Sequence, residues 1–345
     1  MSNFDAMKLS VETLSGGRNT VVLDDRGIPS IMVRIPRFNL SEVIDGAPNT
    51  PHPAFIVNGV VKDEILVSKF QNMVMNDRAY SLPFKDPRTS VNFDQAVAFC
   101  KNKGAGWHLT TNAEWAAIAL WTKKNGTMPR GNTDYGRDHV ATHERGVESH
   151  KSDATRTGRI HTGSGPVTWA HDHTNAGIFD MTGNVWEWTG GMRTNNGEIQ
   201  VIENNDAADN TKDQSTGSGL WKAILAADGS LVAPGTAGTL KYDGTSPVKL
   251  STEVAATASV NSMFQDMTVE AGITLPVIAK ALGLAPDGTD YEGRSRFYVN
   301  TDGERLPFRG GNWNIASSAG VFAANLNISR SNSSTNFGFR AAFVL

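Results

Sequence analysis

The chain has 345 residues and a formal net charge of −3, with 32 lysines and arginines against 35 aspartates and glutamates. This length allows two average domains, or one large domain with insertions. No run of lysine and arginine indicates contact with a phosphate backbone, so nucleic acid is not an expected partner. The single cysteine, Cys100, excludes an intramolecular disulfide and any mechanism that needs two thiols in one chain.

Targeting and membrane signals are not visible in the sequence. Residues 1–17 lack a basic segment followed by an apolar run, and no apolar stretch approaches the length of a membrane span. We therefore expect neither a Sec signal nor a membrane span.

The N-terminal residues 1–60 contain short β segments, at residues 20–23 and 31–35, separated by turn-forming Asp, Gly and Pro residues. This pattern predicts an N-terminal β extension over residues 1–60, followed by the main domain over residues 61–345.

Two amphipathic helices are predicted next. The first begins near Asn92 and places Cys100 on its apolar face as a small core residue. The second follows Thr111, which stands three residues before Glu114 in a capping-box spacing, and it ends at Gly126.

The remaining segments differ in composition. Residues 126–169 are polar and without periodicity, which predicts a long surface loop of the kind that often carries function. Residues 195–300 are rich in Asn, Asp, Gly and Ala, with one helix candidate at residues 275–284, and we interpret them as an insertion packed on the main domain. The tail, residues 309–345, carries no Lys, Asp or Glu.

A set of motifs then stands in a recognisable order. The string GNVWEW at residues 183–188 follows GIFDM at residues 177–181, and RGGNW at residues 309–313 and GFR at residues 338–340 follow downstream. Together with WHLTTNAEW at residues 107–115, these motifs resemble the formylglycine-generating-enzyme branch of the C-type lectin fold. Thr110 departs from the pattern, because the family usually has Pro there.

The resemblance implies an α+β, C-type-lectin-like fold with two helices and a twisted, largely antiparallel core. It also implies that a few large side chains anchor the C-terminal part of the domain in its core. The expected scaffold anchors are Trp186, Trp188, Trp313, Phe322 and Arg340.

Within this family the tail resembles the variable region of proteins that are diversified by retroelements, whose founding example is a phage tropism determinant. Such diversification acts on adenines, so an AAC codon for Asn is converted to codons for Ser, Thr, Ile or Ala, but never to Lys, Glu, Gln, Met or Trp. None of these excluded residues occurs between Asn314 and Phe337. Small Asn and Ser side chains around apolar anchors also suit adaptable hydrogen bonding at a binding surface. A plain polar loop surface is the alternative, which the Trp, Gly and Phe-Arg framework disfavours.

The resemblance implies a binding protein rather than an enzyme, with a protein or glycan on a cell surface as its ligand and no required cofactor. It implies display in a phage tail, on the virion, or on a bacterial cell surface after a cytoplasmic stage, and a homo-oligomer stays open. The expected diversified, ligand-binding positions are Asn312, Asn314, Ile315, Ser317, Ser318, Ala323, Asn325, Asn327, Ile328, Ser329, Asn332, Ser334, Thr335 and Asn336.

Enzymatic alternatives from the same family need residues that this chain lacks. The formylglycine-generating enzymes use two cysteines to bind copper and engage the substrate thiol, and Cys100 stands alone. The sulfoxide synthases bind iron through His-x3-His-x-Glu, whereas His139 and His143 are followed by Arg145 at the position of the carboxylate. A metal-dependent oxidase that uses the six histidines of residues 139–173 stays the alternative.

Calcium is a second open question. Relatives bind Ca²⁺ around the Gly-Asn-x-Trp-Glu-Trp turn, and the matching ligands are the carboxylates of Asp180 and Glu187 with the carbonyls of Gly183 and Val185, a mixture that suits this ion. The alternative is a purely structural turn, in which Glu187 or Asn184 caps backbone groups. A calcium-dependent lectin is therefore a further alternative function.

Overall fold

The computed structural model describes residues 2–344, which hold five α-helices. The helices are α1 (Asn3–Leu14), α2 (Leu40–Val43), α3 (Phe93–Lys101), α4 (Asn112–Lys124) and α5 (Val277–Ala281). Short 3₁₀ turns are η1 (Pro53–Phe55), η2 (Val167–Trp169), η3 (Asp206–Ala208), η4 (Phe264–Asp266) and η5 (Ala316–Ser318). Within residues 2–344, no helix combines the length and apolar composition needed to cross a bilayer.

The two predicted amphipathic helices, α3 and α4, are confirmed, and capping boxes begin both. Asn92 accepts from the backbone N–H of Gln95 at the start of α3, at 2.9 Å. At the start of α4, the Thr111 hydroxyl accepts from the backbone N–H of Glu114 at 3.1 Å, and the carboxylate accepts from the Thr111 N–H at 2.9 Å. Each box satisfies two backbone donors that a helix start leaves unpaired. Cys100 is fully buried, as predicted.

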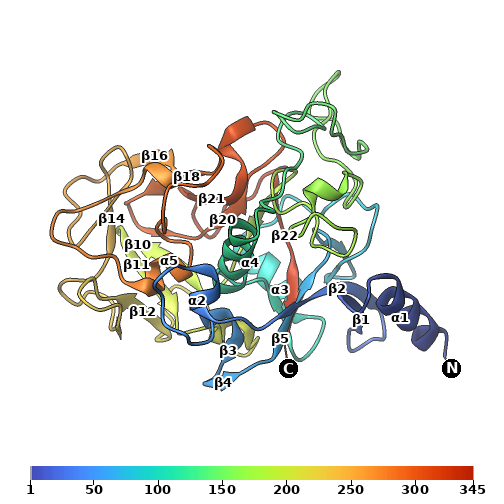
Figure 1. The fold of residues 1–345 in the computed structure, drawn as a ribbon, viewed down its shortest axis with the longest axis horizontal. Helices are drawn as coiled ribbons and strands as arrows, with labels where there is room; N and C mark the ends of the chain where they lie inside the picture. The colour runs from blue at the N-terminus through green and yellow to red at the C-terminus, as the bar shows by residue number, and fades with distance from the viewer. Residues whose placement is uncertain (1, 345) are drawn as a thin grey trace.

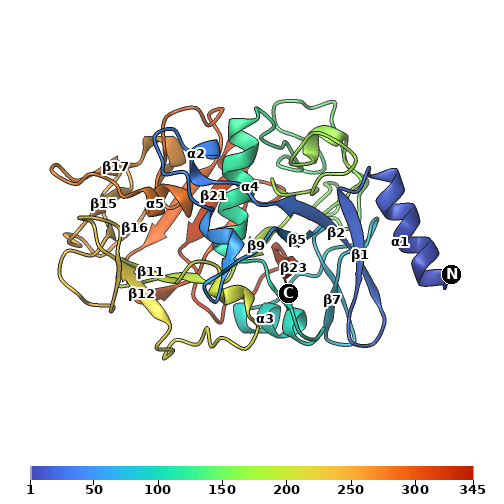
Figure 2. The same ribbon diagram turned by 60° about the horizontal axis from the view of Figure 1, so that its bottom comes forward.

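The N-terminal segment, expected as a β extension over residues 1–60, holds two strands that join a sheet of the main domain. Its strands enter a five-stranded sheet with a strand of the tail, and α1 and α2 were not predicted. Figure 2 shows α1 at one end of the long axis, beside β1 and β2, with the loops of β12 and β15 at the other end. In order, the sheet contains β1 (Asn19–Leu23), β2 (Pro29–Pro36), β5 (Glu64–Ser68), β23 (Ala341–Phe343) and β8 (Trp107–Leu109).

A six-stranded sheet holds three of the four strands of the tail (Figure 1). In order, it contains β16 (Ser259–Met263), β18 (Arg296–Asn300), β21 (Gly320–Leu326), β20 (Phe308–Gly310), β9 (Trp186–Trp188) and β22 (Phe337–Phe339). The sheet is mixed, because β18 pairs with β21 and β22 pairs with β9 in parallel, while the other pairs are antiparallel.

The segment 195–300 is more closely integrated into the domain than the predicted insertion. Its strands β16 and β18 belong to the same sheet as β21 of the tail, and helix α5 is shorter than the predicted 275–284. The rest forms most of an eight-stranded sheet. Its main path is β13 (Leu231–Val232), β12 (Trp221–Ile224), β11 (Glu198–Ile202), β14 (Lys241–Asp243), β15 (Lys249–Ser251) and β17 (Thr268–Val269), and β10 (Met192–Asn195) pairs with both β11 and β19 (Glu304–Arg305).

Two small ribbons complete the strands, β3 (Ile56–Val57) with β4 (Val60–Val61) and β6 (Met73–Met75) with β7 (Arg78–Tyr80). Residues 126–169 form the predicted loop, with η2 as their one regular turn among the described residues.

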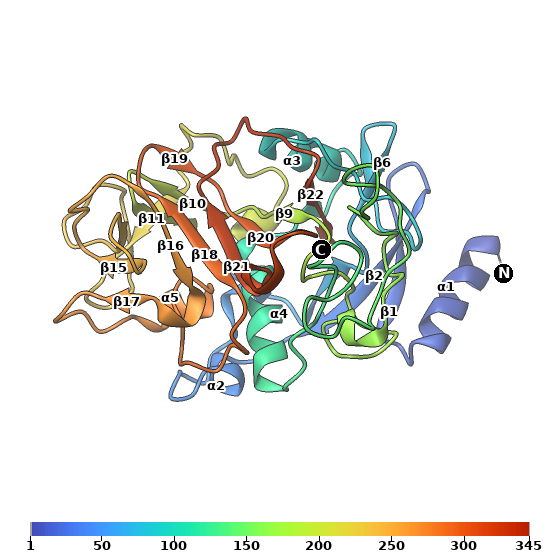
Figure 3. The same cartoon turned by 90° about the horizontal axis from the view of Figure 1, so that it is seen from above.

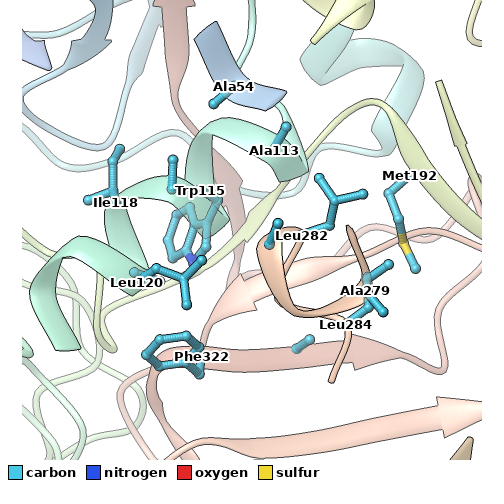
Figure 4. Close-up of a cluster of buried hydrophobic side chains, with 14 of the residues drawn as sticks. Ala54, Ala113, Trp115, Ile118, Leu120, Met192, Ala279, Leu282, Leu284 and Phe322 are labelled. Carbon is cyan, nitrogen blue, oxygen red and sulfur yellow. The ribbon is translucent and has the colours of Figure 1, made fainter. Parts of the chain in front are cut away.

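The main core lies where α4 and α5 pack on one side of β21. Figure 4 shows Trp115, Leu120 and Phe322 meeting there, with Leu282 and Leu284 beside them. The indole N–H of Trp115 donates to the backbone carbonyl of β21 at Val321, 2.7 Å away. This bond lets a large aromatic ring be buried without leaving its polar group unpaired.

Candidate functional site

The tail is held in place by buried side chains. Trp188 and Phe322 are 0% and 2% exposed, and Trp186 and Trp313 are also buried, so the expected burial of the four aromatic anchors is confirmed. The Phe308 ring lies 3.7 Å from that of Trp188 between ring centroids, which fixes β20 against β9. Large aromatic groups packed in this way contribute several kcal/mol each to stability.

The anchor Arg340 forms a fully buried ion pair with Glu187. Its Nε donates to Oε2 at 2.6 Å and its Nη2 to Oε1 at 2.7 Å, and the two residues are 0% and 1% exposed. Arg340 also donates to the backbone carbonyls of Ser68 and Phe179, each at 3.0 Å. This guanidinium therefore connects the end of the tail to β9, to β5 and to the loop before the Gly183–Trp188 motif.

The other two arginines of the tail serve the same purpose. Arg309 is buried and donates through Nε to the Asn112 side chain at 3.0 Å, and burial lowers the pKa of its guanidinium to about 10. Arg330 donates to the carboxylate of Glu304 at 3.2 Å and to that of Asp94 at 2.8 Å. Arg330 thus fixes the loop between β21 and β22 to its neighbours.

The residues between these anchors reach solvent to different degrees. Figure 3 shows β18, β21, β20 and β9 lying next to one another, with the loop of residues 126–169 beside them. Twelve of the fourteen predicted positions are exposed or partly exposed, and we call them the polar face. They are Asn314, Ile315, Ser317, Ser318, Asn325, Asn327, Ile328, Ser329, Asn332, Ser334, Thr335 and Asn336.

Two predicted positions do not project outward, which corrects the expectation for them. Asn312 is 2% exposed, and Ala323 is 0% exposed within the cluster that holds Trp186 and Phe308. The side-chain oxygen of Asn312 is buried without a hydrogen-bond partner among the described residues.

Hydrogen bonds within the polar face are local. The Asn325 side-chain oxygen accepts from the backbone N–H of Asn327 at 2.9 Å, and that of Asn332 accepts from the Ser329 hydroxyl at 2.6 Å. Such bonds order the loops through short side chains, as Asn and Ser do in turns. The tail contributes no carboxylate or ammonium group to this surface.

The long loop 126–169 supports one edge of the polar face. Its Tyr135 donates from the backbone to the Trp313 carbonyl at 2.8 Å, and Thr133 accepts from the Ala316 N–H at 3.0 Å. The guanidinium of Arg156 lies 4.1 Å from the centre of the Tyr135 ring. We did not predict these residues, because the sequence of the loop has no periodicity that places a side chain on a surface.

Protein groups engage two of the four expected calcium ligands, the Glu187 carboxylate and the Val185 carbonyl. Both carboxylate oxygens of Glu187 accept from Arg340, and the Gln71 side-chain N–H donates to Glu187 at 3.0 Å and to the Val185 carbonyl at 3.3 Å. Asp180 accepts from the Gly163 N–H at 2.9 Å, and burial raises its pKa to about 6. Within residues 2–344, Oδ1 of Asp180 is buried without a hydrogen-bond partner. Because Arg340 and Gln71 engage Glu187, the set of Asp180, Gly183, Val185 and Glu187 offers fewer free oxygens than the six to eight that surround a Ca²⁺ ion.

The surroundings of Cys100 and of residues 139–145 bear on the enzymatic alternatives. Cys100 is fully buried in α3, and burial raises the pKa of its thiol, which disfavours the reactive thiolate. Glu144, next to His143, binds Arg130 and the Trp169 indole, 2.8 Å from the latter. Among residues 2–344 no group of three or more His, Cys, Asp or Glu side chains could hold a metal ion.

Comparison with solved structures gives remote similarities. PvdO from Pseudomonas aeruginosa is 13% identical, with a TM-score of 0.38, and Treponema denticola variable protein 1 is 14% identical, with a TM-score of 0.35; both alignments cover 94% of this chain and 98% of the other. The Major Tropism Determinant U1 variant is 12% identical, with a TM-score of 0.31, over 94% of this chain and 71% of that one. These values are too low to transfer a role to this chain.

Comparison at the sequence level is more decisive. No curated protein sequence matches the chain. The model of the sulfatase-modifying factor enzyme 1-like domain matches residues 13–242, a span that contains β1, β2, both predicted helices and the Gly183–Trp188 motif. The chain belongs to this family, whose domain has the C-type-lectin-like fold of the formylglycine-generating enzymes.

Proposed function

We propose that this chain is a ligand-binding protein whose C-terminal surface is diversified by a retroelement, and that it is not an enzyme. One observation carries the proposal. The tail alternates between large side chains buried in the core and small polar side chains that are exposed or partly exposed. Substitutions on the polar face can therefore change the binding surface while the fold stays the same.

The chemistry of the polar face suits recognition. Asn, Ser and Thr supply both hydrogen-bond donors and acceptors on short side chains that lose little conformational entropy when they are ordered. Combining sites of antibodies use the same residue types beside aromatic groups. The ligand we propose is a protein or glycan on a cell surface, bound by a chain displayed in a phage tail or on a bacterium.

Catalysis and metal dependence are not part of the proposal. A thiol-based oxidase needs an accessible thiolate, and the burial of Cys100 opposes one. A calcium-dependent lectin needs free oxygen ligands, and Arg340 engages the Glu187 carboxylate. We therefore expect ligand binding to persist in a chelator.

The neighbouring DNA provides the test of diversification. We expect a near-repeat of the codons for Arg309 to Ala342, beside a reverse-transcriptase gene, that differs from them almost wholly at adenines. Differences should concentrate in the codons of the polar face, and the codons for Phe322 and Arg340 serve as internal controls that stay identical. Flanking DNA without such a repeat would contradict the proposal.

A further inference from the structure

We propose that Asn261, Arg296 and Tyr298, which lie outside the tail on strands β16 and β18, form a constant part of the binding face. Together with the polar face they recognise a protein surface that presents a carboxylate beside an apolar side chain. This inference rests on the proposed binding function, and it adds the constant contacts and the chemistry of the partner.

The register of the six-stranded sheet places these residues beside the tail. Tyr298 of β18 pairs with Asn325 of β21, and Asn261 of β16 pairs with Tyr298. Paired residues on neighbouring strands point to the same side of a sheet, and alternate residues point to opposite sides. Phe297 and Val299 are accordingly fully buried on the opposite side, in the main core.

Direct contacts join the two parts of this surface. The hydroxyl of Ser259, at the start of β16, donates to the Asn327 side chain of the polar face at 3.1 Å. Asn261 is exposed, and Arg296, Tyr298 and Asn325 are partly exposed. In Figure 3, β16 and β18 continue the same sheet beyond β21 on the side viewed. The surface therefore extends from the tail across both strands.

Tyr298 has the features of an aromatic anchor for a ligand. Its ring meets Trp186 edge to face, with 6.4 Å between centroids, so one side is supported while part of the ring stays in contact with solvent. Its hydroxyl makes no hydrogen bond within residues 2–344. A pre-ordered tyrosine loses little entropy on binding, which is why this residue dominates the energy of many interfaces.

The charge of Arg296 favours a partner that carries a negative group. Its Nη1 donates to the Asn261 side-chain oxygen at 2.5 Å, and it forms no ion pair within the described residues. The tail that adjoins it contains no Asp or Glu. A guanidinium that is oriented but has no counter-charge favours an anionic group on the partner, and carboxylate is the common one on protein surfaces.

The composition of the combined surface favours a protein over a glycan or a small molecule. Tyr and Arg are enriched in protein interfaces, and Arg296 and Tyr298 follow this pattern. The Asn and Ser side chains of the polar face are the residue types that antibody combining sites place around such anchors. The cavity of about 670 Å³, the kind of space that takes a small molecule, is lined by Arg34, Phe38 and Trp121 among others, and by no residue of β16, β18 or the tail.

A phage-displayed library tests the proposed binding function and the proposed constant contacts separately. The full chain is displayed on phage with Asn314, Ser317, Asn325, Asn327 and Asn332 randomised, and binders are selected on calcium-loaded calmodulin, an acidic protein with an apolar surface. Lysozyme, a basic protein, and a set of immobilised glycans are the comparison probes. We expect the strongest binders on calmodulin.

The selected binders are then tested with Tyr298→Ala and Arg296→Gln. Each change should weaken calmodulin binding on the order of tenfold or more, across binders with different tails. Tyr298→Phe removes only the hydroxyl and should keep most of the affinity, which separates the contribution of the ring from that of the hydroxyl. Arg26→Gln, on the exposed β1–β2 turn, is the matched charge control and should change nothing.

Each of the other outcomes contradicts a specific part of the proposal. Binders whose affinity survives both Tyr298→Ala and Arg296→Gln would overturn the constant contacts but leave the proposed function standing. Selection on glycans alone would overturn the protein partner. A library that yields no binder to any probe would count against the binding function itself, and the inference would end with it.

Discussion

The buried residues that hold the tail in place, which we call the framework, differ from the polar face in the kind of polar groups they contain. The framework contains the charges, Glu187, Arg309 and Arg340, each almost completely buried and held by several partners. The polar face contains neutral side chains whose hydrogen bonds are local or made to a neighbouring strand. A buried charge is specific to its partners, whereas a short neutral side chain at the surface can be exchanged for another at little cost.

This difference explains how one fold can keep its stability while its surface changes. Strand β21 shows it within seven residues, because Phe322, Ala324 and Leu326 enter the main core and Asn325 points to the solvent side. Variation is tolerated where the pleat directs a side chain away from the core. Four predictions test the contrast, from the largest expected effect to the smallest.

The largest effect is expected from breaking the buried ion pair. Glu187→Gln leaves the Arg340 charge buried without its counter-charge, so the free energy of unfolding should fall by about 3–5 kcal/mol. Urea denaturation measures this loss in the free energy of unfolding. Glu64→Gln is the matched control, because Glu64 pairs with Arg34 near the surface and should contribute below about 1 kcal/mol. Equal losses for the two variants would remove the distinction between framework and surface charges.

The next prediction compares two neighbours on β21. Leu326→Ala removes a side chain that is 1% exposed in the main core, and we expect a loss of about 2–5 kcal/mol in the free energy of unfolding. Asn325→Ala, one residue earlier on the solvent side, should change it by less than about 0.5 kcal/mol. Chemical denaturation of both variants measures the two free energies of unfolding. A large loss for Asn325→Ala would contradict the assignment of Asn325 to the solvent side of β21.

A third prediction concerns Lys103, a buried charge outside the tail that has no acidic partner in hydrogen-bond contact. Its ammonium donates to Ser30 at 2.7 Å and lies 3.2 Å from the centre of the Trp107 ring, and burial lowers its pKa to about 7. Above pH 7 the folded chain releases this proton while the unfolded chain still holds it. The free energy of unfolding should therefore rise with pH, by about 2 kcal/mol between pH 7 and 9.

The measurement is the difference in unfolding free energy between the wild type and Lys103→Met as pH increases. This difference should grow in favour of the wild type above pH 7, whereas the difference to Lys101→Met, at an exposed site in α3, should stay constant. A pH-independent difference for Lys103→Met would show that the buried lysine keeps its proton.

Much of the framework could be predicted because it depends on local patterns. The capping boxes at Asn92 and Thr111 and the Trp anchors are visible as spacing and residue type, and the structure confirms them. Helix α1 was missed, although Ser2 and Asp5 form a capping box, because the turn-forming residues that follow suggested strands throughout. Periodicity is a weaker guide at the ends of a chain than in its core.

The shape of the binding face could not be predicted from the tail alone. Ala323 follows Phe322 in the sequence, and only its packing in the cluster of Trp186 and Phe308 shows that its side of the strand is also covered. Tyr298 joins the face through pairing between strands more than 20 residues apart. Contacts of this kind depend on tertiary register, which no local pattern encodes.

The smallest effect is expected for asparagines of the polar face. Asn327→Ser and Asn332→Ser exchange one short polar group for another at sites in contact with solvent, so each should shift the free energy of unfolding by less than about 0.5 kcal/mol. Asn184→Ser is the matched control in the framework. Its side chain accepts from the Ile160 N–H at 2.9 Å and donates to Gln71 at 2.8 Å, so its loss should cost about 1–3 kcal/mol. If the three variants were equally stable, the polar groups of the framework would be as replaceable as those of the face, and the distinction on which the binding model depends would fail.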